Sequence, residues 1–279
     1  MPRALDPAIR EALAERMRFY RDLGLTEFYR RPVEVGRDEA SGVADEVPVS
    51  ATQPASGACS NFFEEDPAIK TKKGFAAPPQ VGALVPQEER IAALKAIRED
   101  IGDCTRCALH KGRNKIVFAD GSPTARLMFV GEGPGADEDA QGLPFVGRAG
   151  QLLNNMIAAM GLKREECYIA NIVKCRPPGN RTPEPDEANT CSPFLFKQIG
   201  VVRPQVLVAL GATAATYLLG ARQPLAGLRG RVHAFRGMSL IVTYHPAFLL
   251  RDPRQKKEAW ADLQIAMKEL GLKRAGNRE

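Results

Sequence analysis

Residues 127–150 read LMFVGEGPGADEDAQGLPFVGRAG, and this stretch decides the fold. The run Leu127–Val130 is apolar at every position, which predicts a strand buried on both faces, as in a parallel sheet. The strand stops at the turn Gly131–Gly135, because glycine and proline interrupt regular structure. A glycine-rich backbone of this kind allows a ligand to approach closely.

The segment after this turn is expected to shape a pocket. Gly142, Pro144 and Gly147 should keep the chain out of helix until about Gly147. Phe145 is then presented from a loop just above the strand end. An aromatic ring at that place can stack on a planar ligand.

Two other interpretations of the glycine turn remain open. It can be a strand-to-helix connection without function. It can also bind a dinucleotide, because Gly131, Gly133 and Ala136 satisfy G-x-G-x-x-A. Pro134 removes one amide and three acidic residues follow at positions 137–139, and both features disfavour a pyrophosphate.

Apolar strands alternate with helical segments along the rest of the chain, which predicts an α/β fold with helices on both faces of a parallel sheet. Further strands are expected at Glu166–Val173, Gln205–Leu210 and Leu240–Thr243, with a short one at Val232–Phe235. Helices are expected at Glu88–Asp100, Asp186–Ile199, Ala212–Leu219 and Lys257–Leu270. Ligands of such sheets bind at the carboxyl ends of the strands.

Composition divides the 279 residues into an N-terminal extension and one folded domain. Residues 1–32 are expected to contain an amphipathic helix that binds a partner protein or the domain, or else forms only in part. Residues 33–86 are rich in Ala, Ser, Pro, Gly and acidic residues, which predicts a disordered linker. The domain is expected at residues 87–273, followed by a tail at 274–279.

Basic charge belongs to the domain. Residues 1–90 carry 12 Lys and Arg against 15 Asp and Glu, whereas residues 91–279 carry 27 against 18. This surplus favours a polyanionic partner such as nucleic acid. No apolar run approaches the roughly 20 residues of a membrane span, and acidic residues occupy the place of a signal peptide. We therefore expect a cytoplasmic, nucleoid-associated monomer that does not contact membranes.

Four of the six cysteines form two separated pairs and are expected to bind metal: Cys104, Cys107, Cys175 and Cys191. Four thiolates suit a cubane iron–sulfur cluster or a structural zinc ion, and ligand softness alone does not choose between them. A CxxC redox pair is the alternative, although it leaves the second pair without a role. Cys59 and Cys167 are expected to be free thiols.

Two polar side chains lie at predicted strand ends. The amide of Asn171 offers a donor and an acceptor side by side, which match O4 and N3–H of a uracil ring. A buried Asn that only satisfies neighbouring backbone is the alternative. His245 follows the last strand, where a donor can stabilise developing anionic charge. A histidine that merely caps the strand is the alternative.

The segment after His245 contains the apolar pair Leu249-Leu250 ahead of Arg251. We expect Leu249 to act as a wedge that enters a base stack, with Arg251 on a phosphate. A loop anchored in the core is the alternative.

GEGPG with PFVGRAG, then NIVKCRPPGNR, then YHPAFLLR, together with the four spaced cysteines, resemble the iron–sulfur (family 4) uracil-DNA glycosylases. The resemblance covers about Glu88 to Leu270. It implies a three-layer α/β/α sandwich with a central, mostly parallel four-stranded sheet, and a [4Fe–4S] cluster on the four cysteines. It also implies base excision repair, in which a monofunctional hydrolase removes uracil from single- or double-stranded DNA and leaves an abasic site.

The resemblance also implies site residues: Glu132, Glu138 and His245 for catalysis, Gly133, Phe145 and Asn171 for uracil, and Asn180, Leu249 and Arg251 for DNA. In the best-known branch of the superfamily an Asp positions the water where this chain has Gly133. Either Glu132 or Glu138 must then take that role, and the choice stays open. The same branch excludes thymine with a Tyr where this chain has Gly135, so thymine exclusion falls to another residue, for which Glu138 is the candidate. A non-catalytic nucleic-acid-binding or damage-sensing iron–sulfur protein is the alternative function.

Overall fold

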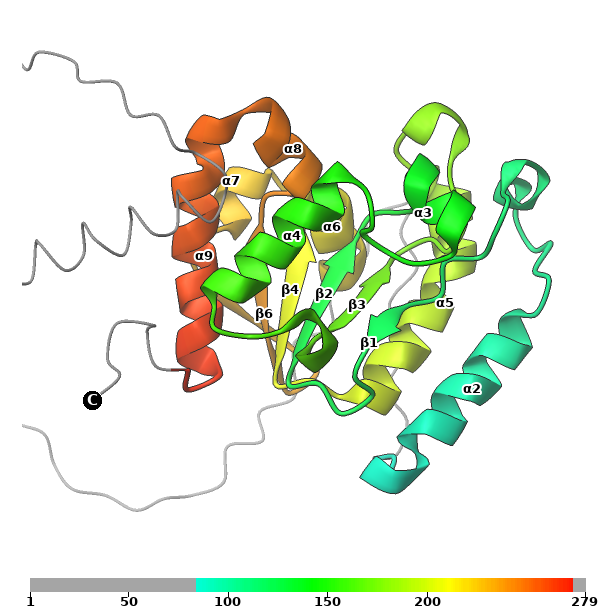
Figure 1. The fold of residues 1–279 in the computed structure, drawn as a ribbon, viewed down its shortest axis with the longest axis horizontal. Helices are drawn as coiled ribbons and strands as arrows, with labels where there is room; N and C mark the ends of the chain where they lie inside the picture. The colour runs from blue at the N-terminus through cyan, green and yellow to red at the C-terminus, as the bar shows by residue number, and fades with distance from the viewer. Residues whose placement is uncertain (1–83, 273–279) are drawn as a thin grey trace, which may run out of the picture.

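The computed structural model describes residues 84–272, in which a six-stranded sheet lies between helices (Figure 1). This arrangement confirms the α/β class. The helix expected within residues 1–32, nearly all of the linker expected at 33–86 and the tail expected at 274–279 lie outside the described residues. Within the described part, no helix combines the length and the apolar character that crossing a membrane requires.

The sheet has the strand order β1-β3-β2-β4-β6-β5. Its four central strands are parallel, as predicted: β3 (Tyr168–Asn171), β2 (Leu127–Gly131), β4 (Val206–Leu210) and β6 (Met238–Thr243). Two antiparallel strands flank them, namely β1 (Asp120–Gly121) and β5 (Val232–Phe235). The sequence indicated β5 but not β1, which is only two residues long.

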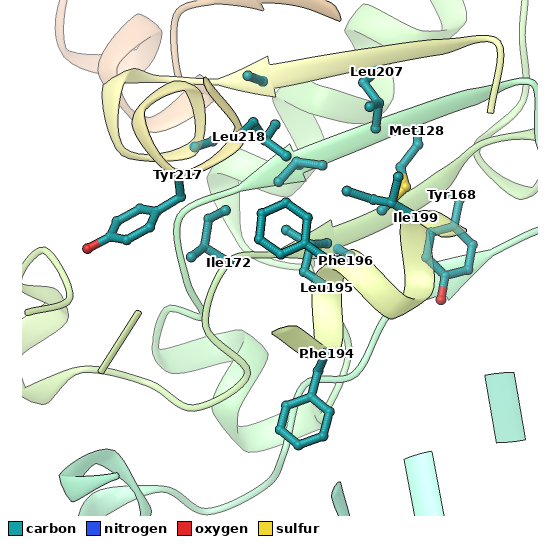
Figure 2. Packing of buried hydrophobic residues seen from close by; sticks show 14 of the residues in the cluster. Met128, Tyr168, Ile172, Phe194, Leu195, Phe196, Ile199, Leu207, Tyr217 and Leu218 are labelled. Carbon is teal, nitrogen blue, oxygen red and sulfur yellow. The ribbon is translucent and has the colours of Figure 1, made fainter. Parts of the chain in front are cut away.

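Side chains two apart on a strand share a face, so each parallel strand contributes to two cores. Met128 and Val130 point to the face covered by α5 (Pro185–Val202) and α6 (Ala212–Leu219), with α2 (Arg90–Ile101) packed against α5. Figure 2 shows this packing with side chains from strands and helices together: Met128, Tyr168, Leu195, Ile199, Leu207 and Leu218.

Leu127 and Phe129 point to the opposite face, where α4 (Arg148–Ala159) and α9 (Lys256–Glu269) cover the sheet and form the second core with it. Both faces are therefore buried, which is why the parallel strands are apolar throughout. The described residues also form α7 (Leu225–Leu228) and five 3₁₀ turns at Gln87–Glu89, Ala108–Gly112, Arg164–Glu166, Pro178–Asn180 and Pro253–Gln255.

The segment after the glycine turn differs from expectation, because it forms the short helix α3 (Ala136–Gln141) before α4 begins. A carboxylate oxygen of Glu138 accepts a hydrogen bond from the Gly135 N–H, which caps the first turn. Acidic residues in that turn stabilise the helix, because their negative charges lie near the positive end of the helix dipole. Gly142 then ends the helix with a φ of 82°. Phe145 still lies in the loop between α3 and α4.

The segment after His245 is also helical, as α8 (Pro246–Arg251). Proline suits the first position of a helix, and His245 caps it. Leu249 is only 1% exposed and packs among Leu152, Met156 and Leu263 in the second core. The wedge predicted for Leu249 is therefore wrong in this structure, and the alternative of an anchor in the core is correct.

Leu249→Ala should lower the free energy of unfolding by about 2–5 kcal/mol, because it removes a buried side chain and leaves a cavity. Arg251→Ala, on the exposed side of the same helix, should change it by less than about 0.5 kcal/mol. Urea unfolding of both variants measures the difference. Equal stability of the two variants would contradict the buried position of Leu249.

Candidate active site

A cavity of about 540 Å³ opens at the carboxyl ends of the parallel strands. The chain leaves β2 toward β3 on one side and leaves β4 toward β6 on the other, so strand order reverses between β2 and β4. Open α/β sheets bind ligands at such a switch point. Eight of the nine predicted non-metal site residues line the cavity: Glu132, Gly133, Glu138, Phe145, Asn171, Asn180, His245 and Arg251.

Asn171 ends β3 directly beside Gly131 of β2. The residue is 1% exposed, and its Oδ1 has no hydrogen-bond partner among the described residues. A buried acceptor without a partner costs roughly 1–3 kcal/mol, so this one is suited to a donor on a ligand. A Cβ on Gly131 would lie 2.3 Å from that oxygen. Only glycine leaves room for the Asn171 amide.

Phe145 is held in a backbone conformation that side chains rarely adopt, with a φ of 53°. The Arg164 guanidinium donates to the carbonyls of Pro144 at 2.7 Å and Phe145 at 3.2 Å. Gly150 permits the close approach of α4, because a Cβ there would lie 1.9 Å from the Phe145 carbonyl oxygen. These contacts fix the ring at the cavity wall, where its centroid lies 5.6 Å from that of His245.

Glu138 ties the turn to the loop before α4. Its Oε2 accepts from the Gly135 N–H at 3.0 Å, and its Oε1 accepts from the N–H groups of Val146 at 3.0 Å and Gly147 at 3.2 Å. Both carboxylate oxygens are therefore occupied by backbone donors. This arrangement gives Glu138 a structural task at the cavity wall.

Glu132, the other candidate carboxylate, is bound differently. Its Oε2 accepts a hydrogen bond from the Thr213 hydroxyl at 2.5 Å. Its Oε1 makes no hydrogen bond to any residue between 84 and 272, and the side chain lines the cavity. One oxygen of Glu132 is thus open to a ligand or a water.

His245 caps α8 through its ring, because Nδ1 accepts a hydrogen bond from the Ala247 N–H at 3.1 Å. In the neutral imidazole the proton then resides on Nε2, which is a donor. Withdrawal of the ring from water, aided by the positive charge of Arg251, lowers its pKa to about 4, although Glu138 opposes this shift. At neutral pH His245 is an uncharged donor.

The junction between β6 and α8 is anchored by Tyr244. The Arg229 guanidinium lies 4.0 Å above the Tyr244 ring, and Phe248 stacks on the same ring with a centroid distance of 5.0 Å. Arg229 in turn donates to the buried carboxylate of Asp262 at 2.8 Å. These contacts hold the neighbouring His245 in place.

Three cationic side chains line the cavity: Arg148, Arg181 and Arg251. Arg181 is positioned by two hydrogen bonds to Glu187, at 2.7 and 2.8 Å. Asn180 accepts from Arg176 at 2.8 Å and lies on the same loop. Sequence reasoning missed Arg148 and Arg181 as site residues. The stretches PFVGRAG and PPGNR, which contain them, were the available signal.

The four paired cysteines meet around a second, smaller cavity, whose other walls are mainly apolar: Cys104, Cys107, Cys175 and Cys191. The Arg113 guanidinium lies 3.5 Å from Cys175 Sγ, and the Lys174 N–H lies 3.3 Å from Cys191 Sγ. Among residues 84–272, no three His, Cys, Asp or Glu side chains are spaced to hold a single metal ion.

The other two cysteines lie elsewhere. Cys167 belongs to the second core and has no disulfide partner, as expected of a free thiol. Burial raises the pKa of Cys167 to about 12, so the thiol stays protonated. Cys59 lies outside the described residues.

A family model for the uracil DNA glycosylase superfamily matches residues 118–264, which contain β2, β3, β4, β6 and every residue that lines the cavity. The chain belongs to this superfamily. A type-4 uracil-DNA glycosylase of Thermotoga maritima is 45% identical over 161 residues, which cover 57% of this chain and 84% of the relative. A type-4 uracil-DNA glycosylase of Pyrobaculum aerophilum is 42% identical over 180 residues, covering 62% and 92%.

The His245 ring should stay neutral from pH 8 to pH 5, as NMR of its ring protons can show. Its pKa of about 4 lies below the roughly 6.5 of an unfolded chain, so the unfolded state binds more protons between these values. The stability that His245 contributes is complete above about pH 6.5 and is lost as the pH falls toward 4. Arg251→Ala should raise this pKa. A midpoint near 6.5 in the wild type would contradict the structure.

Proposed function

We propose a route by which this chain, a uracil-DNA glycosylase of DNA repair, releases uracil at the cavity between β2 and β4. One observation carries the proposal. A buried acceptor without a partner, Asn171 Oδ1, and a neutral donor, His245 Nε2–H, belong to the same cavity wall. A pyrimidine ring that is rotated out of the helix offers both a donor and a growing negative charge.

Uracil is recognised at its edge and its face. Asn171 Oδ1 accepts the N3–H, and the amide nitrogen donates to O4. Cytosine presents an acceptor at N3 and a donor at N4, so the same amide rejects it. Phe145 stacks on the ring from its fixed place in the wall. A wrong base leaves Asn171 buried and unpaired, which is why discrimination at this position is strong.

Bond cleavage sends the electron pair of the C1′–N1 bond onto the uracil ring, and negative charge builds on O2. His245 Nε2–H and backbone amides of the turn at Gly133 meet that charge. A preorganised donor in a site shielded from water acts mainly on the transition state. Because His245 is neutral, its interaction with the uncharged base is weak and strengthens as the charge develops.

Glu132 positions the water that attacks C1′. We choose it over Glu138 because both oxygens of Glu138 are occupied by backbone N–H groups, whereas Glu132 Oε1 is open. The water oxygen forms the new bond to C1′, and the carboxylate takes its proton and later releases it to solvent. The uracil anion is protonated by solvent after it leaves.

DNA contacts come from the three arginines that line the cavity. Arg148, Arg181 and Arg251 can neutralise phosphates beside the flipped nucleotide. Glu138 fixes the loop that carries Phe145. Its side chain stays at the cavity wall, where we expect it to exclude thymine by blocking the methyl group on C5 of that base.

Asn171→Ala and His245→Ala should each slow uracil release by about 10²–10³-fold, since each removes a preorganised group at the base. Single-turnover cleavage of a uracil oligonucleotide, revealed by alkali, measures the rate. Glu165→Ala, on the exposed 3₁₀ turn before β3, serves as the control and should be unchanged. Full activity in both site variants would exclude this pocket, and a wild type without any base release would favour a damage-sensing protein.

We also propose that Cys104, Cys107, Cys175 and Cys191 hold a [4Fe–4S] cluster. One observation supports it: the four cysteines line one small cavity whose other walls are mainly apolar. Four thiolates are the ligand set of a cubane cluster. When bound, the cluster cross-links two distant segments of the chain. Four thiolate ligands leave no position for a catalytic water.

The purified protein should be brown and contain about four iron atoms per chain, as measured by visible absorbance and metal analysis. Cys175→Ala and Cys191→Ala should lose the colour and the iron. Cys167→Ala, which also removes a buried thiol, should keep both, because Cys167 lies in the other core. Bound zinc in place of iron would overturn the cluster and leave the ligand set intact.

A further inference from the structure

The turn after β4 contacts two proposed catalytic residues, Glu132 and His245, which follow the neighbouring strands. β4 lies between β2, which leads to Glu132, and β6, which leads to His245. Its own end continues into Gly211-Ala212-Thr213. The Gly211 N–H donates to the Thr243 carbonyl at 2.8 Å, which extends the pairing of β4 with β6.

Gly211 fits closely against His245. Its φ of 93° is a conformation that other residues rarely adopt, and a Cβ there would lie 3.1 Å from the His245 Cβ. A larger residue at position 211 would therefore be strained by its backbone conformation and crowd the Cβ of His245. The turn sets the position of Thr213, two places after Gly211, on the first turn of α6.

Thr213 reaches the opposite way, toward β2. Its hydroxyl donates to Glu132 Oε2 at 2.5 Å, a length typical of an O–H group bonded to a charged carboxylate. This is the single side-chain hydrogen bond that Glu132 makes to residues 84–272. A glutamate has several rotamers, and the bond selects one of them and leaves Oε1 for the water.

We infer that Thr213 is the positioning residue for Glu132 in the hydrolytic step. The inference rests on the proposed role of Glu132 in holding the water. Thr213 does not line the cavity, so its effect passes through the carboxylate and not through contact with DNA or uracil. The turn after β4 thus contacts both Glu132 and His245, although it contributes no group to the base itself.

Thr213→Val keeps the shape of the side chain and removes the hydroxyl. Single-turnover uracil release should fall by about 10- to 100-fold, the range expected for a hydrogen bond to a charged group. The dissociation constant for uracil-containing DNA should stay within about 2-fold, because no DNA contact is lost. Thr213→Ser should restore the rate, since it restores the donor. Thr216→Val, one turn later on α6, is the matched control and should keep the wild-type rate.

A double-mutant cycle separates this inference from the role of Glu132. Once Glu132→Gln has removed the carboxylate, Thr213→Val should cause no further loss. If Glu132→Gln alone leaves the rate unchanged, the proposed role of Glu132 fails. Suppose instead that Glu132→Gln is slow. The role of Thr213 alone then fails if Thr213→Val is as fast as wild type, or if Thr213→Val slows the Glu132→Gln enzyme by the same factor as it slows the wild type. Thermal melting confirms that each variant is folded. If Thr213→Val does not fold, Thr213→Ala, which also removes the hydroxyl, takes its place and should show the same loss of rate.

Discussion

The pocket depends on a glycine, Gly131, at the end of β2, because only a residue without a side chain fits there. Gly131 pairs with Asn171 in the sheet, and a Cβ there would lie 2.3 Å from Asn171 Oδ1 and 2.6 Å from the Phe145 ring. The amide that we propose reads the edge of the base and the ring that we propose stacks on its face therefore converge over one glycine. A larger residue would displace both, and sheet pairing offers no other place for the amide.

The positions of the main site residues could be predicted because they follow from strand ends. Parallel strands buried on both faces are apolar throughout, so a polar residue at a carboxyl end is conspicuous, as with Asn171 and His245. The same rule applied to β4 does not indicate Thr213, which lies beyond the strand on the first turn of α6. Thr213 was missed because a threonine at the start of a helix is common and carries no chemistry of its own.

Other features depend on contacts that sequence does not reveal. YHPAFLLR places three apolar residues in succession, and only the rotation of α8 decides that Leu249 faces the core while Phe248 lines the cavity. The choice between Glu132 and Glu138 likewise depends on partners from other segments. Local hydrogen bonds of Glu138 also produced α3, where glycine and proline had suggested only a loop.

One stretch of chain, residues 171–175, borders both the cavity at the strand ends and the cysteine cavity. Lys174 is buried between them, and its ammonium donates to the Asn171 carbonyl at 2.9 Å and to Gln198 at 2.6 Å. Cys175 follows directly and turns into the cavity. A buried ammonium is tolerated only with such partners, so this link is rigid. Fixing Cys175 and Cys191 therefore also fixes the end of β3, and with it the Asn171 amide to which we assign recognition of the base.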